Sequence, residues 1–182
     1  ANHVLWYYKQ KGESCVYRPV NRLDRGTSGL ICIAKNAYTH DRLSAQIKSG
    51  ELKRIYMAIA VGKVLPEMGR INLPVGRKDG CVLERQVRPD GQRAVTNYET
   101  ICFSSQHTLL KIELETGRTH QIRVHLSHLG YPLAGDFLYG TQEGIERQAL
   151  HSAKLKFIQP VTLEQLEFES KIPKDMENLL KG

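Results

Sequence analysis

Residues 21–30 have the sequence NRLDRGTSGL, and residues 31–34 (ICIA) continue it as a short apolar run. The only acid in this segment, Asp24, lies between Arg22 and Arg25, and nearby positive charge favours the ionised form of a carboxylate. Residues 30–34 are apolar and include β-branched side chains, so they predict a buried strand. The Gly-Thr-Ser-Gly turn would then hold Asp24 at the mouth of that strand.

Residues 22–25 have two interpretations. Taken alone they favour a solvated turn with a surface ion pair, which contributes about 0–1 kcal/mol. The alternative is one carboxylate held in a positive field, an arrangement suited to chemistry on a polyanion. The choice between these two interpretations depends on the rest of the chain.

The segment that follows predicts a helix and then a strand. Asn36 is a candidate N-cap for a helix that extends to about Lys48. Residues 53–62 (KRIYMAIAVG) predict a strand with two different faces. Tyrosines in strands most often belong to the core, but a ring flanked by small residues also leaves room for a flat partner. One face would carry Tyr56, Ala58 and Ala60, and the other Ile55, Met57, Ile59 and Val61.

Residues 70–93 predict two basic loops around short strands, at residues 74–80 and 88–93. Both loops contain an Asp-Gly pair, which favours a turn because glycine accepts a positive φ. The loops either bind an RNA backbone or are solvated turns, and the residues favour neither interpretation. The candidate contacts are Arg77, Lys78, Arg88 and Arg93.

Residues 94–115 predict a hairpin whose turn lies at residues 104–106. Glu113 and Glu115 would share one face of its second strand. Paired carboxylates occur in glycosidases. The simpler interpretation is the polar face of an amphipathic strand, and we favour it.

Residues 116–130 (TGRTHQIRVHLSHLG) predict a short helix. Ile122, Leu126 and Leu129 have helical spacing from Thr119 onward, and Gly130 is a suitable end. Arg118 lies near the helix N-terminus, where backbone N–H groups favour an anion. The polar side would carry Gln121, His125 and His128; these histidines match no common zinc spacing, so we expect no metal site.

The ends of the chain also carry regular patterns. Residues 1–10 predict a short amphipathic helix that ends near Gly12. Residues 150–168 predict a pair of strands, and residues 173–180 predict a closing helix.

The composition is that of one globular domain with a basic surface. The 182 residues are 41% hydrophobic and 25% charged, and no apolar run approaches the roughly 20 residues of a membrane-spanning helix. Residues 1–63 hold eleven Lys and Arg against four Asp and Glu, which accounts for the whole net charge of +7. Such a basic region favours a nucleic-acid partner, although many soluble proteins are also basic. The four cysteines are scattered, which favours reduced thiols in a cytoplasm.

Three of these segments together resemble a known family. NRLDRGTSGL, KRIYMAIAVG and GRTHQIRVH occur in the order found in RluA-type pseudouridine synthases, and residues 132–140 and 150–155 continue the likeness. The family more often has His at the position of Asn21. The resemblance covers residues 1–182 and implies an α+β catalytic domain with a mixed, mostly antiparallel sheet flanked by short helices. It also implies that an upstream strand and any N-terminal RNA-binding domain are missing from this chain.

The resemblance implies isomerisation of specific uridines in structured RNA, ribosomal or transfer, by base flipping and without a cofactor or metal. Asp24 would be the catalytic residue, acting as nucleophile or as base. Tyr56 would stack on the target base, and Arg123 would pair with Asp24. Arg22, Arg25, Arg118, His120 and Gln121 would contact phosphate or base.

Two other interpretations remain at this stage. The domain could bind RNA without catalysis, or it could be a carboxylate glycosidase. For the main interpretation we expect a cytoplasmic monomer with structured RNA as its partner and no association with a membrane.

Overall fold

The computed structural model describes residues 2–14, 16–142 and 144–181. Its main sheet has seven strands in the order β11-β10-β4-β9-β8-β5, with β2 added alongside β10. The β2–β10 pair is parallel and every other pair in this sheet is antiparallel. The strands are β2 (Ser28–Gly29), β4 (Lys53–Val61), β5 (Met68–Asn72), β8 (Val95–Phe103), β9 (His107–Leu114), β10 (Leu150–Ile158) and β11 (Gln165–Glu169). The predicted mixed, mostly antiparallel α+β fold is therefore confirmed.

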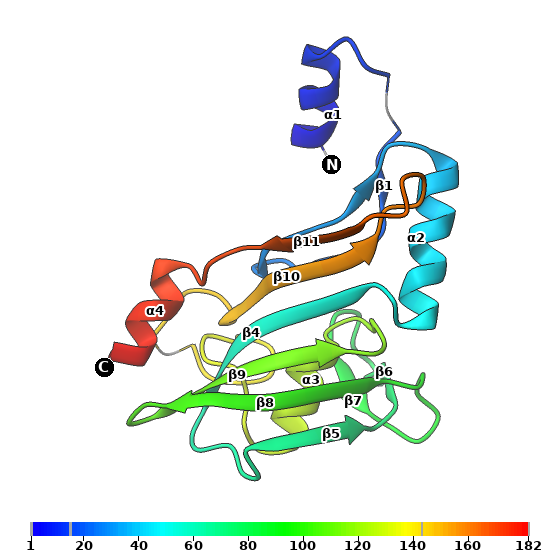
Figure 1. Cartoon of the computed structure of the whole chain (residues 1–182). Helices are drawn as coiled ribbons and strands as arrows, with labels where there is room; N and C mark the ends of the chain where they lie inside the picture. The colour runs from blue at the N-terminus through cyan, green and yellow to red at the C-terminus, as the bar shows by residue number, and fades with distance from the viewer. Residues whose placement is uncertain (1, 15, 143, 182) are drawn as a thin grey trace.

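Two small antiparallel pairs and four helices complete the fold (Figure 1). The pairs are β1 (Arg18–Pro19) with β3 (Ile33–Ala34), and β6 (Val75–Arg77) with β7 (Arg85–Val87). The helices are α1 (Asn2–Gln10), α2 (Ala37–Ser49), α3 (Gln121–His128) and α4 (Lys174–Lys181). In Figure 1, α1 stands apart from the sheet, and none of its described residues is buried. Within the described ranges, no helix is long and apolar enough to cross a bilayer.

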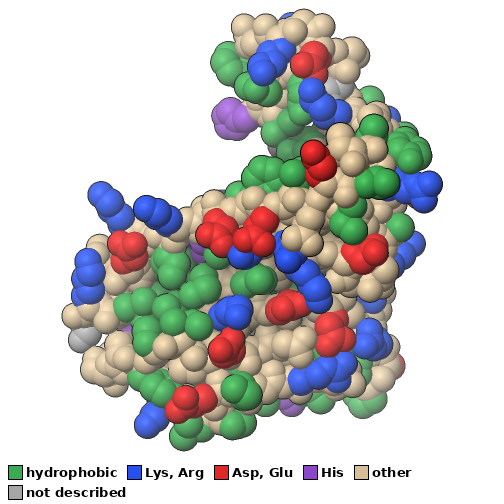
Figure 2. All heavy atoms as spheres, viewed as in Figure 1, with side chains coloured by type: hydrophobic (Ala, Val, Ile, Leu, Met, Phe, Trp, Pro, Cys, Tyr) green, Lys and Arg blue, Asp and Glu red, His purple; other side chains and the backbone are tan. Residues whose placement is uncertain are grey.

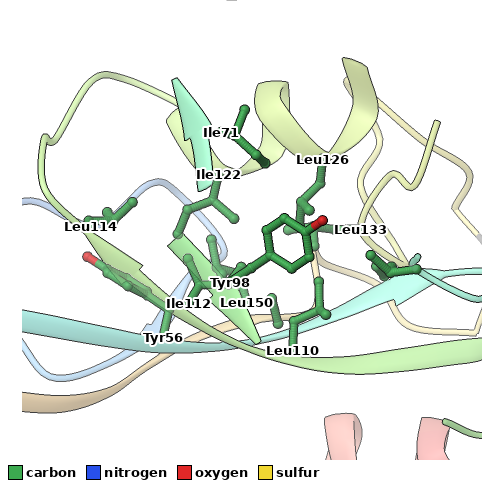
Figure 3. Packing of buried hydrophobic residues seen from close by; sticks show 13 residues of the cluster. Tyr56, Ile71, Tyr98, Leu110, Ile112, Leu114, Ile122, Leu126, Leu133 and Leu150 are labelled. Carbon is green, nitrogen blue, oxygen red and sulfur yellow. The ribbon is translucent and has the colours of Figure 1, made fainter. Parts of the chain in front are cut away.

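The two faces of β4 separate as its period-2 pattern predicts. Tyr56, Ala58 and Ala60 join the core that α3 covers with Ile122 and Leu126. The opposite face belongs to a second core, which includes Ile59 of β4, Leu109 of β9, and Met176 and Leu179 of α4. Figure 3 shows α3 and α4 on opposite sides of the sheet. This separation confirms the predicted strand.

Only the end of the predicted strand at residues 30–34 is confirmed, as β3 at residues 33–34, because the chain changes partner in the middle of the segment. β2 ends at Gly29, Ile31 is exposed, and β3 begins at Ile33 against β1. Gly29 has a φ of 105°, and a Cβ there would lie 2.3 Å from the carbonyl oxygen of Ser152 on β10. Glycine is therefore required where the loop of Asp24 joins the main sheet.

Helix α2 begins and ends as its sequence predicts. The Asn36 side chain accepts a hydrogen bond from the backbone N–H of Thr39 at 2.8 Å, and Gly50 at the C-terminus has a φ of 81°. The end residues of this helix thus satisfy local backbone requirements.

Helix α3 differs from its prediction in two ways. It begins at Gln121 rather than Thr119, because His120 has a left-handed φ of 56°. Gln121 and His125 are buried instead of lying on a solvent-exposed polar side. The ring nitrogens of His125 lie 2.9 Å from Thr96 Oγ1 and 2.9 Å from the carbonyl oxygen of Leu73, so the histidine links α3 to β8 and to the chain after β5.

Candidate active site

Asp24 lies in the loop of residues 21–27, on the side of the sheet that α3 covers. Its side chain is 25% exposed, and its Oδ2 lies 3.8 Å from Nη1 of Arg123. The loop borders a cavity of about 610 Å³, which we call the Asp24 cavity. Its other walls are Arg54 and Tyr56 of β4, residues 114–119 and the start of α3. The carboxylate is therefore open to a ligand in this cavity and faces a cation at its back.

Arg123 is held rigidly behind Asp24. Its side chain is only 2% exposed, and Nε and Nη2 each donate a 2.7 Å hydrogen bond to the fully buried carboxylate of Asp136. Burial opposes its charge, but the hydrogen bonds to Asp136 and the charges of Asp136 and Asp24 raise the pKa of Arg123 above its ordinary value. A two-point pair fixes the guanidinium plane, which leaves Nη1 to face Asp24.

The arginines that flank Asp24 in sequence are not its ion-pair partners in the structure. Arg22 donates a 3.0 Å hydrogen bond to Thr119 Oγ1, and the side chain of Arg25 is exposed. The cation closest to the carboxylate is instead Arg123, from the third motif. The expectation that Arg22 and Arg25 supply the positive field directly is corrected accordingly.

Tyr56 forms part of the cavity wall and is only 5% exposed. Figure 3 shows its ring at one end of the core cluster, with the hydroxyl pointing away from the cluster. Burial raises the pKa of Tyr56 above its ordinary value, Arg54 opposes this rise, and Asp24 adds to it. The phenol therefore stays protonated at neutral pH and presents a flat, neutral surface.

The segment before β10 fixes the backbone of the Asp24 loop. Gln148 Nε2 donates to the carbonyl oxygen of Arg25 at 2.6 Å and to Thr27 Oγ1 at 3.1 Å. Arg147 Nη1 donates to the carbonyl oxygen of Gly26 at 3.1 Å, and the same guanidinium pairs with Asp175 of α4. Neither residue is predicted from the sequence, because no local pattern marks a side chain that supports a distant backbone.

Asn21, where the family more often has His, also fixes this loop. It is buried, and its Oδ1 accepts a 2.7 Å hydrogen bond from the backbone N–H of Cys32. The amide therefore ties the start of the loop to the chain that enters β3.

Among the predicted RNA contacts, Arg22, Arg93, Arg118 and Gln121 border the Asp24 cavity. The Gln121 amide is already engaged, because its oxygen accepts from Arg118 N and Thr116 Oγ1 while its nitrogen donates to β8. These hydrogen bonds indicate that Gln121 supports the backbone of residues 116–118.

His120 lies beside the cavity and connects to the basic hairpin. Its Nδ1 lies 2.8 Å from the hydroxyl of Tyr139, which accepts a 2.8 Å hydrogen bond from the backbone N–H of Arg85 on β7. Burial lowers the pKa of His120, and the charge of Asp24 opposes this shift. The β6–β7 hairpin is thus anchored next to the Asp24 loop.

The charges of the hairpin are largely paired within it. Lys78 lies 2.6 Å from Glu84, and Arg88 pairs with Asp79 at 2.7 Å and also with Asp90. All of these residues except Glu84 border a second, separate hollow of about 460 Å³. Arg77 also borders it, and its side chain has no ion-pair partner in the part of the chain that the structure describes. Arg77 is therefore the hairpin cation best placed for an external phosphate.

Glu113 and Glu115 are held by different cations. Glu113 pairs with Lys53 at 2.8 Å. Glu115 pairs with Arg70 at 3.0 Å, and hydrogen bonds from Arg70 and Asn97 lower its pKa to about 2. This arrangement supports the polar strand face rather than a glycosidase pair, in which one carboxyl has a raised pKa.

Within the described residues, no group of three or more His, Cys, Asp or Glu side chains could hold a metal ion. Cys32, Cys81 and Cys102 are free thiols, and Cys15 lies outside the described residues.

Comparisons with known proteins identify the family of this chain. A family model described as RNA pseudouridylate synthase matches residues 5–128. The Bacillus subtilis protein named Uncharacterized RNA pseudouridine synthase YjbO is 45% identical over 183 residues, covering 100% of this chain and 65% of that protein. Ribosomal large subunit pseudouridine synthase D of Vibrio parahaemolyticus is 38% identical over 190 residues, covering 96% of this chain and 58% of that protein.

Two solved human structures share the fold. Human RNA Pseudouridylate Synthase Domain Containing 4 has a TM-score of 0.76 at 22% identity, covering 97% of this chain and 78% of that one. Human RNA Pseudouridylate Synthase Domain Containing 1 has a TM-score of 0.74 at 24% identity, covering 86% of this chain and 69% of that one. This chain spans only about three-fifths of the length of the curated relatives named above. The match over most of its residues nevertheless shows that the chain belongs to the RNA pseudouridylate synthase family.

Proposed function

We propose that this protein isomerises uridine in structured RNA to pseudouridine, with Asp24 as its catalytic residue. The observation that carries the proposal is the grouping of Asp24 and Tyr56 at one cavity, with Arg123 directly behind Asp24, in a member of this family. In the reaction the bond from N1 to C1′ breaks, C5 bonds to C1′, C5 loses its proton and N1 gains one. The reaction is an isomerisation, so it needs no co-reactant.

The proposal assigns a task to each of the three residues. The Asp24 carboxylate acts either as a nucleophile at an electrophilic carbon or as a base on a sugar proton, and both roles remain open. Arg123 orients it, because its own position is fixed by Asp136. Tyr56 stacks on the extruded base, which stabilises the bound state by about 1–3 kcal/mol.

The cavity is suited to a flipped nucleotide. Its volume of about 610 Å³ lies within the roughly 300–1,000 Å³ of sites that enclose small ligands. A uridine in a duplex has to leave the stack to reach Asp24, at a cost of a few kcal/mol. Arg22, Arg93 and Arg118 line the cavity and would offset this cost by binding backbone phosphate.

We propose ribosomal RNA rather than transfer RNA as the substrate, because the Vibrio relative is named for the large ribosomal subunit. The monomeric state and the cytoplasmic location stay predictions.

The test is tritium release from RNA labelled at C5 of uridine. We expect release by the wild-type protein, and we expect Asp24→Asn to abolish it while leaving the Kd for RNA nearly unchanged. Turnover that survives in Asp24→Asn would contradict the assignment of the catalytic residue. RNA binding without release by the wild-type protein would instead indicate a binding module.

A further inference from the structure

Arg54 is buried in the wall of the Asp24 cavity without a carboxylate partner. The residue is 5% exposed, and its Nε has no hydrogen-bond partner among the described residues. Its Nη2 lies 3.4 Å from the carbonyl oxygens of Leu114 and Thr116, which is beyond the usual range for such bonds. No described acid forms an ion pair with Arg54, and burial lowers the pKa of its guanidinium below the ordinary value.

The neighbouring loop makes room for this side chain. A Cβ at Gly117 would lie 2.7 Å from Nη1 of Arg54. The glycine of the third motif therefore lets residues 116–118 pass close to the guanidinium without displacing it. Both the cation and the space around it belong to the cavity wall.

The cavity as a whole has more cations than fixed anions to neutralise them. Besides Arg54, its walls include Lys48 of α2 and the three arginines named above as phosphate contacts. Of its two acids, Asp24 lies against Arg123, and Glu115 is shared between Arg70 at 3.0 Å and Arg93 of the cavity wall at 3.5 Å. Arg54 is thus the most deeply buried of the cavity cations, whose summed charge the acids of the cavity wall do not neutralise.

We infer that Arg54 binds a backbone phosphate of the RNA next to the target uridine, an inference that rests on the proposed function. A guanidinium matches the geometry of phosphate with two parallel hydrogen bonds. A desolvated cation also gains more from an anion than from a neutral carbonyl oxygen. Arg54 and Tyr56 lie on the same strand face, about 7 Å apart along the chain direction, so a phosphate at Arg54 would flank a base stacked on Tyr56.

The first test is thermal unfolding without RNA. Arg54→Met retains the length of the side chain and removes the uncompensated charge, so we expect Tm to rise by about 2–4 °C. If Arg54 serves only to hold the carbonyl groups of Leu114 and Thr116, the substitution would lower Tm instead. That outcome would overturn the inference.

The second test is the salt dependence of binding to a uridine-containing stem–loop RNA, measured in the Asp24→Asn background. Loss of one phosphate contact lowers the slope of log K against log [salt] by about 0.7–0.9, and affinity at 0.1 M salt by about fivefold to eightfold. We expect this result for Arg54→Met, whereas Arg54→Lys should retain most of the slope.

Lys174→Met is the matched control, because it removes one exposed positive charge from α4 on the opposite side of the sheet and should leave the slope unchanged. An unchanged slope in Arg54→Met would overturn the inference, even if affinity fell, because it would indicate a neutral base or sugar oxygen at Arg54. Tritium release by the wild-type protein is measured separately, so failure of the phosphate site and failure of the proposed function give different results.

Discussion

The two faces of the main sheet carry charge in different ways. On the face that packs against α4, basic and acidic side chains of neighbouring strands pair with one another, and Figure 2 shows them side by side. The pairs are Lys53–Glu113 at 2.8 Å, Lys111–Glu99 at 3.1 Å and Lys154–Glu169 at 2.8 Å. On the face that packs against α3, Arg54 is buried, no described carboxylate pairs with it, and further cations line the Asp24 cavity. Ion pairs within the protein suit a face that contacts only solvent, whereas unpaired cations suit a face that binds an anion.

The same difference exists within the site itself. Arg123 and Arg54 are both nearly inaccessible, but Arg123 has a buried carboxylate of its own in Asp136. One arginine therefore has a fixed position in the free protein, and the other gains its counter-charge only from a ligand. Removing the partner of the first should have the largest effect of any change considered below.

Asp136→Asn should destabilise the protein by about 3–5 kcal/mol, because it leaves the Arg123 charge buried with only Asp24 nearby. The change is measured as a shift of the urea midpoint at constant m value. Turnover should also fall, since Arg123 loses the bonds that orient it toward Asp24.

The double variant Asp136→Asn/Arg123→Met is the control for this prediction. Because it removes both charges, it should be more stable than Asp136→Asn alone. A loss below about 1 kcal/mol in the single variant would show that Arg123 does not depend on Asp136.

Gly29→Ala should be the next most damaging change, at about 2–3 kcal/mol. It places a Cβ at a φ of 105° and 2.3 Å from the Ser152 carbonyl oxygen, so β2 has to move away from β10 and take the Asp24 loop with it. Gly50→Ala is the control, since Gly50 also has a positive φ, of 81°, but no atom lies within 4 Å of the added Cβ. Its cost should be limited to about 1–2 kcal/mol of backbone strain. Equal losses in the two variants would contradict a steric role for Gly29.

The parts of this molecule that the sequence predicts are those with a local cause. The helix cap at Asn36 and the two faces of β4 depend on residues a few positions apart, and both are confirmed. The strand predicted at residues 30–34 forms only at residues 33–34, because pairing with β10, far along the chain, ends at Gly29 and pairing with β1 begins at Ile33. The burial of His125 likewise depends on Thr96 and Leu73, to which it bonds.

The residues of the candidate site also differ in whether the sequence predicts them. Motifs pick out Asp24, Tyr56 and Arg123, since a resemblance needs only residue types in order. Asp136 and Arg54 are not predicted from the sequence, although both lie in segments that carry the resemblance, residues 132–140 and 53–62. Whether an acid or an arginine is buried, and whether it has a partner, depends on packing between distant segments, such as residues 114–117 against β4.

The smallest predicted effect tests the paired face of the sheet. Lys111→Met removes one member of an exposed pair with Glu99, so it should change the free energy of unfolding by less than about 1 kcal/mol. It should also leave the salt slope of RNA binding and the rate of tritium release unchanged, because Lys111 lies on the face opposite the Asp24 cavity.

The measurement for Lys111→Met uses the same urea titration and the same labelled RNA as the variants of the cavity face. If Lys111→Met reduced the salt slope by nearly one, as expected of Arg54→Met, then RNA would contact both faces and the difference in their pairing would not mark the binding side. An unchanged slope together with a small stability change would restrict RNA binding to the face with unpaired charge.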